Sequence, residues 1–421
     1  MSEHLHSPAF AVSARHPDFP AAFTRSRKLP LPTLVAALCG FRGGSVQSEL
    51  DSFFAHKGGE CSGAGLLRHV TDRALAKARS KLHVPALWAL NAQLIQGMQD
   101  QGLLSLWKGR RLVCADATVL APAQRACHRT RQLAAPSQRA LGLYLPGNEV
   151  MLHVAVGPES EGERQMLFDQ LDLLREGDVL VLDRGYPATW LVQLLHQRGI
   201  DFIIRCDSTR GWKAARDLLR GAGKTPGGDE CWAYLATTTA DKVSTWELDG
   251  PAQMRVRLVR HVSSSGRVRV LATSLTEGVA TAAELGDLYH GRWRIEEAFK
   301  RLKNRLGLES VSGLSQHALL VDVATKVLAD NLASLLNRSV NLGAQEDEAG
   351  VSRKVNRATS AKALSRCVRT LLLQVQTITS LIHDWAAMMG RSLIRHVQGR
   401  NQPRKNTRHK PHPSQAYKRA A

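Results

Sequence analysis

The sequence predicts an α/β fold, because short apolar runs of strand length alternate with amphipathic stretches of helix length along the middle of the chain. Apolar runs at 110–120, 178–186 and 201–206 are bounded by charged residues or Gly, which is typical of buried strands. Helix-period stretches separate these runs at 162–177 and 188–199. This alternation favours an α/β core.

Helical patterns come before the α/β stretch. After a polar lead (1–27), apolar residues recur at helix spacing through 28–105, and Thr71 is placed to cap the helix that follows it. The exposed side of that helix is expected to carry four basic residues, Arg73, Lys77, Arg79 and Lys81. We therefore predict a small basic helical domain at the start of the chain.

Strand patterns return on both sides of the second apolar run. Residues 143–157 read as two strands around a Pro-Gly-Asn turn. Between 207 and 274 the helical signal weakens, which indicates a β-rich insertion. Its expected strands lie at 231–239, 244–249, 254–262 and 267–275. Further helices are expected at 289–303, 317–338 and within 359–398.

The balance of charge indicates a polyanionic partner. The 421 residues include 57 Lys and Arg against 37 Asp and Glu, a formal charge of +20, and nucleic acid is the commonest partner of such chains. A ribosomal or membrane-surface role would also give a basic chain. No signal peptide or membrane-spanning run is visible, and seven dispersed cysteines without a CxxC pair indicate reduced thiols. The sequence therefore predicts a cytoplasmic protein.

The segment YHGRWRIEEAFKRLK (289–303) is the most informative part of the chain. At about 100° per residue on one helix, Tyr289, Arg292, Glu296 and Lys303 fall within an arc of roughly 60°. One face would then present a carboxylate among a phenol, a guanidinium and an ammonium. An apolar stripe runs beside this face: Leu288, Ile295, Phe299, Leu302 and Leu306. Taken alone, the segment could equally be a solvated amphipathic helix.

Two aspartates supply possible partners for Glu296. Asp116 and Asp183 each belong to an apolar run that we read as a strand ending in the aspartate. Carboxylates at the carboxyl ends of strands project into the crevice where ligands bind. Three carboxylates suit Mg²⁺ or Mn²⁺, and two such ions about 4 Å apart would support displacement at phosphorus. The alternative is that each aspartate only forms a turn.

These residues resemble a known family. The spacing of Tyr289, Arg292, Glu296 and Lys303 is similar to the Tyr-Arg-Glu-Lys signature of one subgroup of bacterial insertion-sequence DDE transposases. The segments that begin at Asp183 (Asp-Arg-Gly-Tyr) and at Asp116 (Asp-Ala-Thr) look like the first two carboxylate blocks of that subgroup, with Ala117 where relatives often carry Gly. The likeness covers roughly 110–340, and 71–82 also resembles the group.

The resemblance implies an RNase H-like catalytic core in two parts, 106–206 and 275–340, interrupted by the β-rich insertion at 207–274 and flanked by helical N- and C-terminal segments. It implies that Asp116, Asp183 and Glu296 are catalytic and hold two Mg²⁺ or Mn²⁺ ions. Phosphate-binding residues would be Tyr289, Arg292 and Lys303, with Arg184 and Lys300 beside them. In relatives a Trp of the insertion receives a flipped base, and the candidates here are Trp212, Trp232 and Trp246; the alternative for each is a buried structural role.

The expected partners are double-stranded DNA, as terminal inverted repeats and target, and a second copy of the chain in a synaptic homodimer. We expect the N-terminal helices, with Arg73, Lys77, Arg79 and Lys81, to contact DNA phosphates. Residues 341–399 are assigned to dimerisation and 400–421 to a disordered basic tail. No membrane partner is expected, and the place of action would be the bacterial cytoplasm, at the nucleoid.

Two alternatives stay open at this point. One is an RNase H-like nuclease that cuts DNA without joining it, and the other is a catalytically idle DNA-binding protein such as a repressor. The stretch GAGKT (221–225) resembles the end of a P-loop, but Leu218 stands where the first Gly is needed and Pro226 follows, so nucleotide binding is not expected there.

Overall fold

The computed structural model describes residues 1–24, 29–55, 70–122, 137–207, 211–221, 229–237, 240–263, 266–313, 315–343 and 353–395. The predicted tail at 400–421 lies outside these ranges. The chain divides into two compact units. One contains residues 1–101, 120–138 and 299–421, and the other contains residues 102–119 and 139–298.

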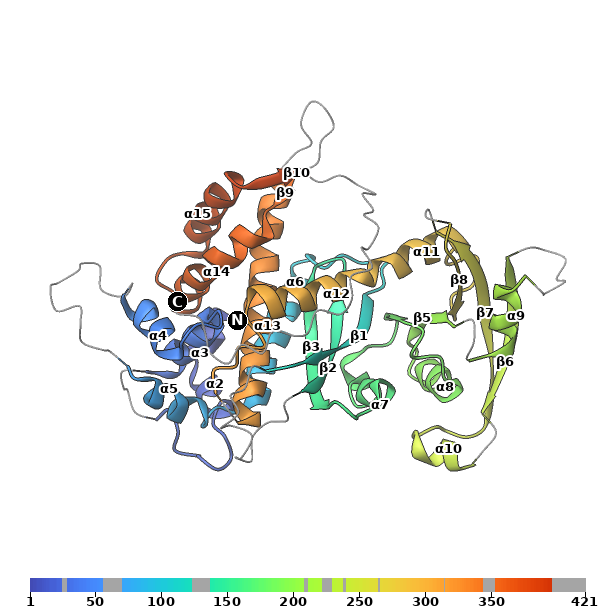
Figure 1. The fold of residues 1–421 in the computed structure, drawn as a ribbon, viewed down its shortest axis with the longest axis horizontal. Coiled ribbons are helices and arrows are strands. Elements are labelled where there is room, and N and C mark those ends of the chain that lie inside the picture. Colours follow the sequence, from blue (N-terminus) through green and yellow to red (C-terminus); the bar gives the residue numbers. More distant parts are fainter. Residues whose placement is uncertain are drawn as a thin grey trace. The chain divides into compact units, whose positions relative to one another are not determined.

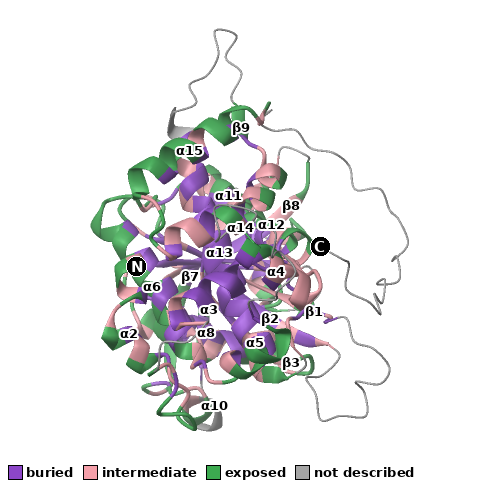
Figure 2. Cartoon of the chain, turned by 90° about the vertical axis from the view of Figure 1, so that its left-hand side faces the viewer, coloured by how far each residue is buried: buried purple, intermediate pink, exposed green. Residues whose placement is uncertain are grey.

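The first unit is mainly helical (Figure 1). Its central helix, α13 (Gln316–Gly343), packs against α3 (Leu31–Gly40) and α6 (Val84–Asp100). Most residues of α3 and α13 are buried (Figure 2). The remaining helices of this part are α1 (Ser2–Leu5), α2 (Pro8–Ser13), α4 (Val46–Ala55), α5 (Asp72–Arg79), α14 (Arg357–Leu372) and α15 (Ile378–Gly390).

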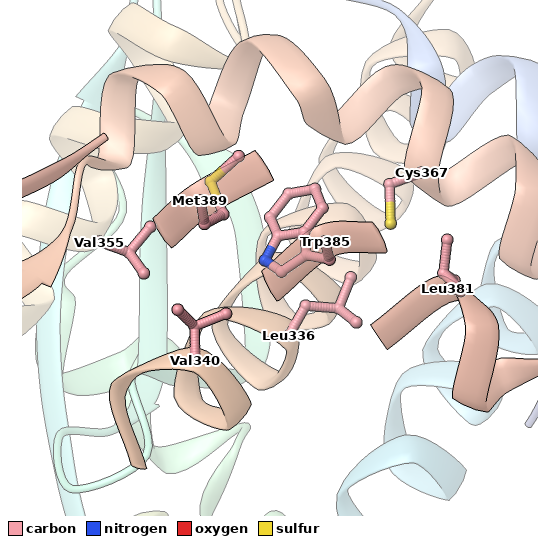
Figure 3. Close-up of a cluster of buried hydrophobic side chains, with 7 residues drawn as sticks. All are labelled: Leu336, Val340, Val355, Cys367, Leu381, Trp385 and Met389. Atoms are coloured by element: carbon pink, nitrogen blue, oxygen red, sulfur yellow. The ribbon is translucent and has the colours of Figure 1, made fainter. Parts of the chain in front are cut away.

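An apolar cluster joins α13, α14 and α15 to a short antiparallel pair of strands, β9 (Arg353–Val355) and β10 (Leu393–Arg395). Trp385 lies at its centre and is 1% exposed (Figure 3). Its indole Nε1 donates a hydrogen bond of 3.2 Å to Asn337, so the ring is buried without leaving its N–H unpaired. The other members are Leu336, Val340, Val355, Cys367, Leu381 and Met389.

The second unit is built on one mixed eight-stranded sheet in the order β3-β2-β1-β4-β5-β8-β7-β6. The inner strands β1 (Leu112–Leu120), β4 (Val179–Leu182) and β5 (Asp201–Cys206) are parallel. The other strands are β2 (Gln138–Leu145), β3 (Val150–Pro158), β6 (Glu230–Thr237), β7 (Ala252–Val262) and β8 (Val268–Thr273). This arrangement confirms the predicted α/β class.

The second unit also contains helices between its strands and after β8. They are α7 (Glu163–Phe168), a 3-10 turn η2 (Leu171–Leu173), α8 (Thr189–Gln197), α9 (Lys213–Leu219), α10 (Ala240–Thr245) and α11 (Ala282–Gly291). The three strands of the insertion extend the core sheet, because β8 pairs antiparallel with β5. The strand expected at 244–249 is wrong, since α10 ends inside it and no strand follows before β7.

The segment 282–306 is less regular than one helix. It consists of α11, a turn at Arg292, α12 (Trp293–Lys300) and a π-helical stretch η3 (Arg301–Arg305). The apolar stripe is confirmed, because Leu288, Ile295, Phe299, Leu302 and Leu306 are all buried. The prediction of a single straight helix through Lys303 is wrong, because the helix is interrupted at Arg292 and becomes π-helical from Arg301. A π-helical turn is wider than an α-helical one and rotates the residues after it.

Within the described ranges, no helix combines the length and apolarity that crossing a bilayer requires.

Candidate active site

The three predicted carboxylates meet on neighbouring elements of the second unit. β1 and β4 pair in parallel, with Cys114 opposite Val181. Continuing this register by two residues brings Asp116 opposite Asp183, the residue that directly follows β4. The prediction that Asp116 ends its strand is wrong, because β1 runs on to Leu120. Asp116 lies beyond the part of β1 that pairs with β4, since that pairing stops at Cys114.

Arg292 lies at the centre of the carboxylates. Its guanidinium donates to Asp116 Oδ2 at 2.7 Å and to Glu296 Oε1 at 3.0 Å, and it lies 4.0 Å from Asp183 Oδ2. The residue is only 4% exposed. The turn between α11 and α12 therefore places one buried cation against all three acids.

Tyr289 and Arg205 complete the surroundings of Asp183. The phenol of Tyr289 donates to Asp183 Oδ1 at 3.0 Å, and Arg205 on β5 lies 3.7 Å from the same oxygen. Arg269 on β8 lies 5.3 Å from the centre of the Tyr289 ring. Sequence reasoning missed Arg205 and Arg269. The available signal was a charged residue inside an otherwise apolar strand, but many such residues only point to solvent.

The electrostatics of the site follow from burial. Burial raises the pKa of Asp116 to about 6, although Arg292 opposes the shift. Burial, together with the charge of Asp183, also raises the pKa of Tyr289 to about 12. For Arg292, burial disfavours the charge, but Asp116, Tyr289 and Asp183 outweigh it and raise its pKa. The guanidinium is therefore charged at any physiological pH, and the phenol keeps its proton.

The donor set fits divalent cations by its chemistry. All three carboxylates lie within 4.0 Å of one guanidinium, so their oxygens already surround a cationic group. Carboxylate oxygens are the ligands that Mg²⁺ and Mn²⁺ prefer. With Arg292 between them, no three acidic, histidine or cysteine side chains of the described residues stand close enough to share one ion. The side chains fit such a metal, provided that Arg292 moves aside.

The other predicted phosphate-binding residues are Arg184 in the second unit and Lys300 and Lys303 in the first. Arg184 is 60% exposed and lies 4.0 Å from Asp207. Lys303 and Lys300 belong to the first unit, where Lys303 pairs with Glu309 at 3.3 Å. The structure thus gathers Tyr289 and Arg292 at the carboxylates, and gives Lys303 an acidic partner of its own.

The basic residues on and just after α5 divide into two groups. Arg73 and Lys77 are exposed, and Lys81 lies 5.8 Å from the centre of the Phe19 ring. Arg79 is only 6% exposed and donates to Ser312, so placing it on the exposed side was wrong. The reason is helical spacing: Arg79 lies four residues after the buried Leu75 and shares its face.

The three tryptophans of the insertion differ in exposure. Trp246 stacks on Trp190 with ring centres 3.7 Å apart, and Trp212 donates to Thr189. Trp232 is 38% exposed, with the Arg255 guanidinium 4.0 Å from its ring centre. Of the three, Trp232 is the one whose ring is most available to a ligand.

Comparison with known proteins places this site in a family. The model of the transposase DDE domain matches residues 107–332. No curated protein matches the sequence. Among solved structures, the chain is similar to a piggyBac transposase synaptic complex with hairpin DNA, with a TM-score of 0.44, 8% identity, and coverage of 92% of this chain and 84% of that one. The matched domain spans more than half of the chain and includes all three carboxylates, so the chain belongs to the DDE transposase family.

Proposed function

We propose that this protein is the transposase of an insertion sequence of the Tyr-Arg-Glu-Lys subgroup, and that it cleaves the terminal inverted repeats and joins them to target DNA. The observation that carries the proposal is the convergence of Asp116, Asp183 and Glu296 on one guanidinium, that of Arg292. Family membership supports the reaction class, and the formal charge of +20 supports a DNA partner.

Asp116, Asp183 and Glu296 would hold the metal. When bound there, two Mg²⁺ or Mn²⁺ ions supply charge stabilisation and activation of the attacking water or 3′-hydroxyl. Tyr289 fixes the orientation of the Asp183 carboxylate through its 3.0 Å hydrogen bond. Arg292 offers a bidentate fork for a DNA phosphate, and Arg184, Lys300 and Lys303 offer further positive charge.

The partners follow from the same reaction. Arg73, Lys77 and Lys81 on and after α5 would contact phosphates of the terminal repeat. Trp232 is the residue of choice for receiving a flipped base, because its ring is partly exposed beside Arg255. Pairing of two ends calls for a homodimer, and we assign that contact to the helices of 341–399. A protein of this kind would act in the cytoplasm, at the nucleoid.

The test is cleavage of a labelled duplex that carries the element's terminal repeat, with Mg²⁺, with Mn²⁺ and with EDTA. We expect metal-dependent nicking at the repeat boundary that falls at least about 100-fold in Glu296→Gln, since a catalytic ligand is lost. Glu297→Gln is the matched control, because Glu297 is the next acid on the same helix and is exposed. Equal losses in both variants would contradict the assignment of Glu296.

Strand transfer separates the two remaining alternatives. With pre-cleaved repeat ends and plasmid target, a transposase joins the 3′ ends to the target, whereas a nuclease only cuts. Specific binding of the repeat without cleavage under any metal would identify an idle DNA-binding protein.

A further inference from the structure

We propose that Arg292 acts as a latch for the metal site. In the DNA-free protein its guanidinium pairs with the three carboxylates and blocks metal binding, and when DNA binds, the guanidinium pairs with a DNA phosphate and releases the carboxylates. This inference rests on the proposed function and concerns how the same site is regulated. It makes Arg292 a positioning residue that couples metal binding to DNA binding.

The contacts of Arg292 support a stable closed state. One guanidinium nitrogen bonds Asp116 at 2.7 Å, and the other bonds Glu296 at 3.0 Å and approaches Asp183 to 4.0 Å. Charge-assisted bonds of this kind are among the stronger ones in proteins. The cation therefore offsets the repulsion among three neighbouring acids in the absence of a metal.

Arg292 and a divalent cation cannot hold these oxygens together. Asp116 Oδ2 and Glu296 Oε1 would have to leave the guanidinium to become ligands, and two cations a few ångströms apart repel. Every metal ion bound there must therefore displace Arg292. The displaced group needs a new anionic partner, because a buried unpaired guanidinium is costly.

The position of Arg292 makes an exchange of partners easy. It stands in the turn between α11 and α12, and its Nε is buried without a hydrogen bond to any described residue. The closed state thus leaves one donor unsatisfied, which a phosphate oxygen can pair. Phosphate and metal should then favour each other, so that a DNA end raises metal affinity and the DNA-free enzyme holds metal weakly.

The test is Mn²⁺ affinity of the DNA-free protein, measured by calorimetry or by the Mn²⁺ electron spin resonance signal. We expect Arg292→Gln to bind Mn²⁺ about tenfold or more tightly than the wild type. Arg294→Gln is the control, because Arg294 contacts the backbone oxygen of Pro146 and no carboxylate of the site. Unchanged or weaker Mn²⁺ binding by a folded Arg292→Gln protein would overturn the latch.

A second measurement keeps the inference testable if Arg292→Gln fails to fold. Adding the terminal-repeat duplex to the wild type, with Glu296→Gln as the metal-site control, should raise Mn²⁺ affinity by a similar factor. No gain on adding DNA would count against the latch. The two proposals can also fail separately. If Arg292→Gln binds Mn²⁺ tightly but the wild type cleaves no DNA, the proposed function is contradicted and the latch is supported.

A different observation points to an anion site in the first unit. We infer that the hollow between α3, α4 and α14 binds a DNA backbone phosphate. The hollow has a volume of about 280 Å³, and three cations of α14 line it: Lys362, Arg366 and Arg369. Their spacing of four and three residues places them on one face of the helix.

These cations lack a matching negative charge. None of them lies within 4.0 Å of a carboxylate among the described residues, and the one acid that lines the hollow, Glu49, accepts hydrogen bonds from the backbone N–H groups of Arg42 and Gly44. Burial, and then the charge of Arg366, lowers the pKa of Arg369. An anion would relieve this repulsion, and phosphate is the one that the proposed function supplies.

The salt dependence of DNA binding tests this site. The double variant Lys362→Ala/Arg366→Ala should bind duplex DNA more weakly, with a salt slope lower by about 1, because one phosphate contact contributes about 0.9. Arg391→Ala, an exposed cation after α15, is the control. An unchanged slope would overturn the site. Stabilisation of the wild type by inorganic phosphate, lost in the double variant without any change in DNA binding, would assign the hollow to free phosphate instead.

Discussion

Arg79 acts as a structural residue within the first unit. It donates to Ser312, and Ser312 donates to Asp322, which is 2% exposed. Gly313 makes room for the guanidinium, because a Cβ there would lie 2.0 Å from Arg79 Nη2. We expect Arg79→Ala to lower the free energy of unfolding by about 3 kcal/mol, since the buried acid loses its balancing charge. Urea titration measures this loss.

Lys77 provides the control for Arg79. It lies on the same helix and is exposed, so Lys77→Ala should change the free energy of unfolding by no more than about 0.5 kcal/mol. The same variant should lower the salt slope of DNA binding, which Arg79→Ala should not do if it folds. A larger stability loss in Lys77→Ala than in Arg79→Ala would contradict both roles.

The cysteines are expected to differ sharply in reactivity. Burial raises the pKa to about 12 for Cys39, Cys114, Cys206 and Cys367. Cys231 on β6 is only half-buried. Because the thiolate is the nucleophile, iodoacetamide at pH 8 should label Cys231 at least about 100-fold faster than those four. Peptide mapping by mass spectrometry reads each site, and equal labelling of Cys114 and Cys231 in folded protein would show that the sheet is open there.

At the scale of elements, α11 depends on its first residues. The hydroxyl of Thr281 accepts from the N–H of Glu284, and the Glu284 carboxylate accepts from the N–H of Thr281, which forms a capping box. We expect Thr281→Ala to cost about 1 kcal/mol of stability. Thr281→Ser should retain most of it, because a hydroxyl remains. Since α11 leads into the turn at Arg292, cleavage activity should fall with Thr281→Ala and recover with Thr281→Ser.

The elements also show what could be predicted from sequence. Thr71 caps α5 as predicted, and its hydroxyl accepts from Ala74, because capping is a matter of a few neighbouring residues. The predicted strand at 244–249 was wrong because Trp246 is a good strand former by propensity, whereas here it packs on Trp190. The stacking of Trp246 on Trp190 therefore outweighs the strand propensity of this short segment.

Sequence reasoning predicted which residues belong to the candidate site, but it did not predict the hydrogen bonds and ion pairs that they form. Apolar runs, spacing and the resemblance to a family were together enough to predict that Asp116, Asp183 and Glu296 belong to one site, and the structure brings all three to Arg292. The central position of Arg292 was not predictable, because its partner Asp116 lies 176 residues away and the pairing of β1 with β4 decides where that carboxylate lies. The register of two strands and the position of a helix break depend on the folded structure. They cannot be read from the spacing of residues in a motif.

At the scale of the whole molecule, the excess of positive charge should govern non-specific DNA binding. Residues 400–421 contain seven Lys and Arg and no acid, so their removal lowers the formal charge from +20 to +13. We expect the shortened protein to bind an unrelated duplex more weakly and with a shallower dependence on salt, because fewer counterions are released. Fluorescence anisotropy at several salt concentrations measures both quantities.

The shortened protein also distinguishes an effect on non-specific DNA binding from an effect on the cleavage rate. The carboxylates and Arg292 belong to the second unit, so saturating amounts of repeat duplex should be cleaved at close to the wild-type rate once binding is complete. The difference should appear at low DNA concentration, where association is limited by charge. A large loss of the saturated rate, with non-specific affinity and salt slope unchanged, would mean that this segment serves the reaction itself and contributes nothing to electrostatic capture of DNA.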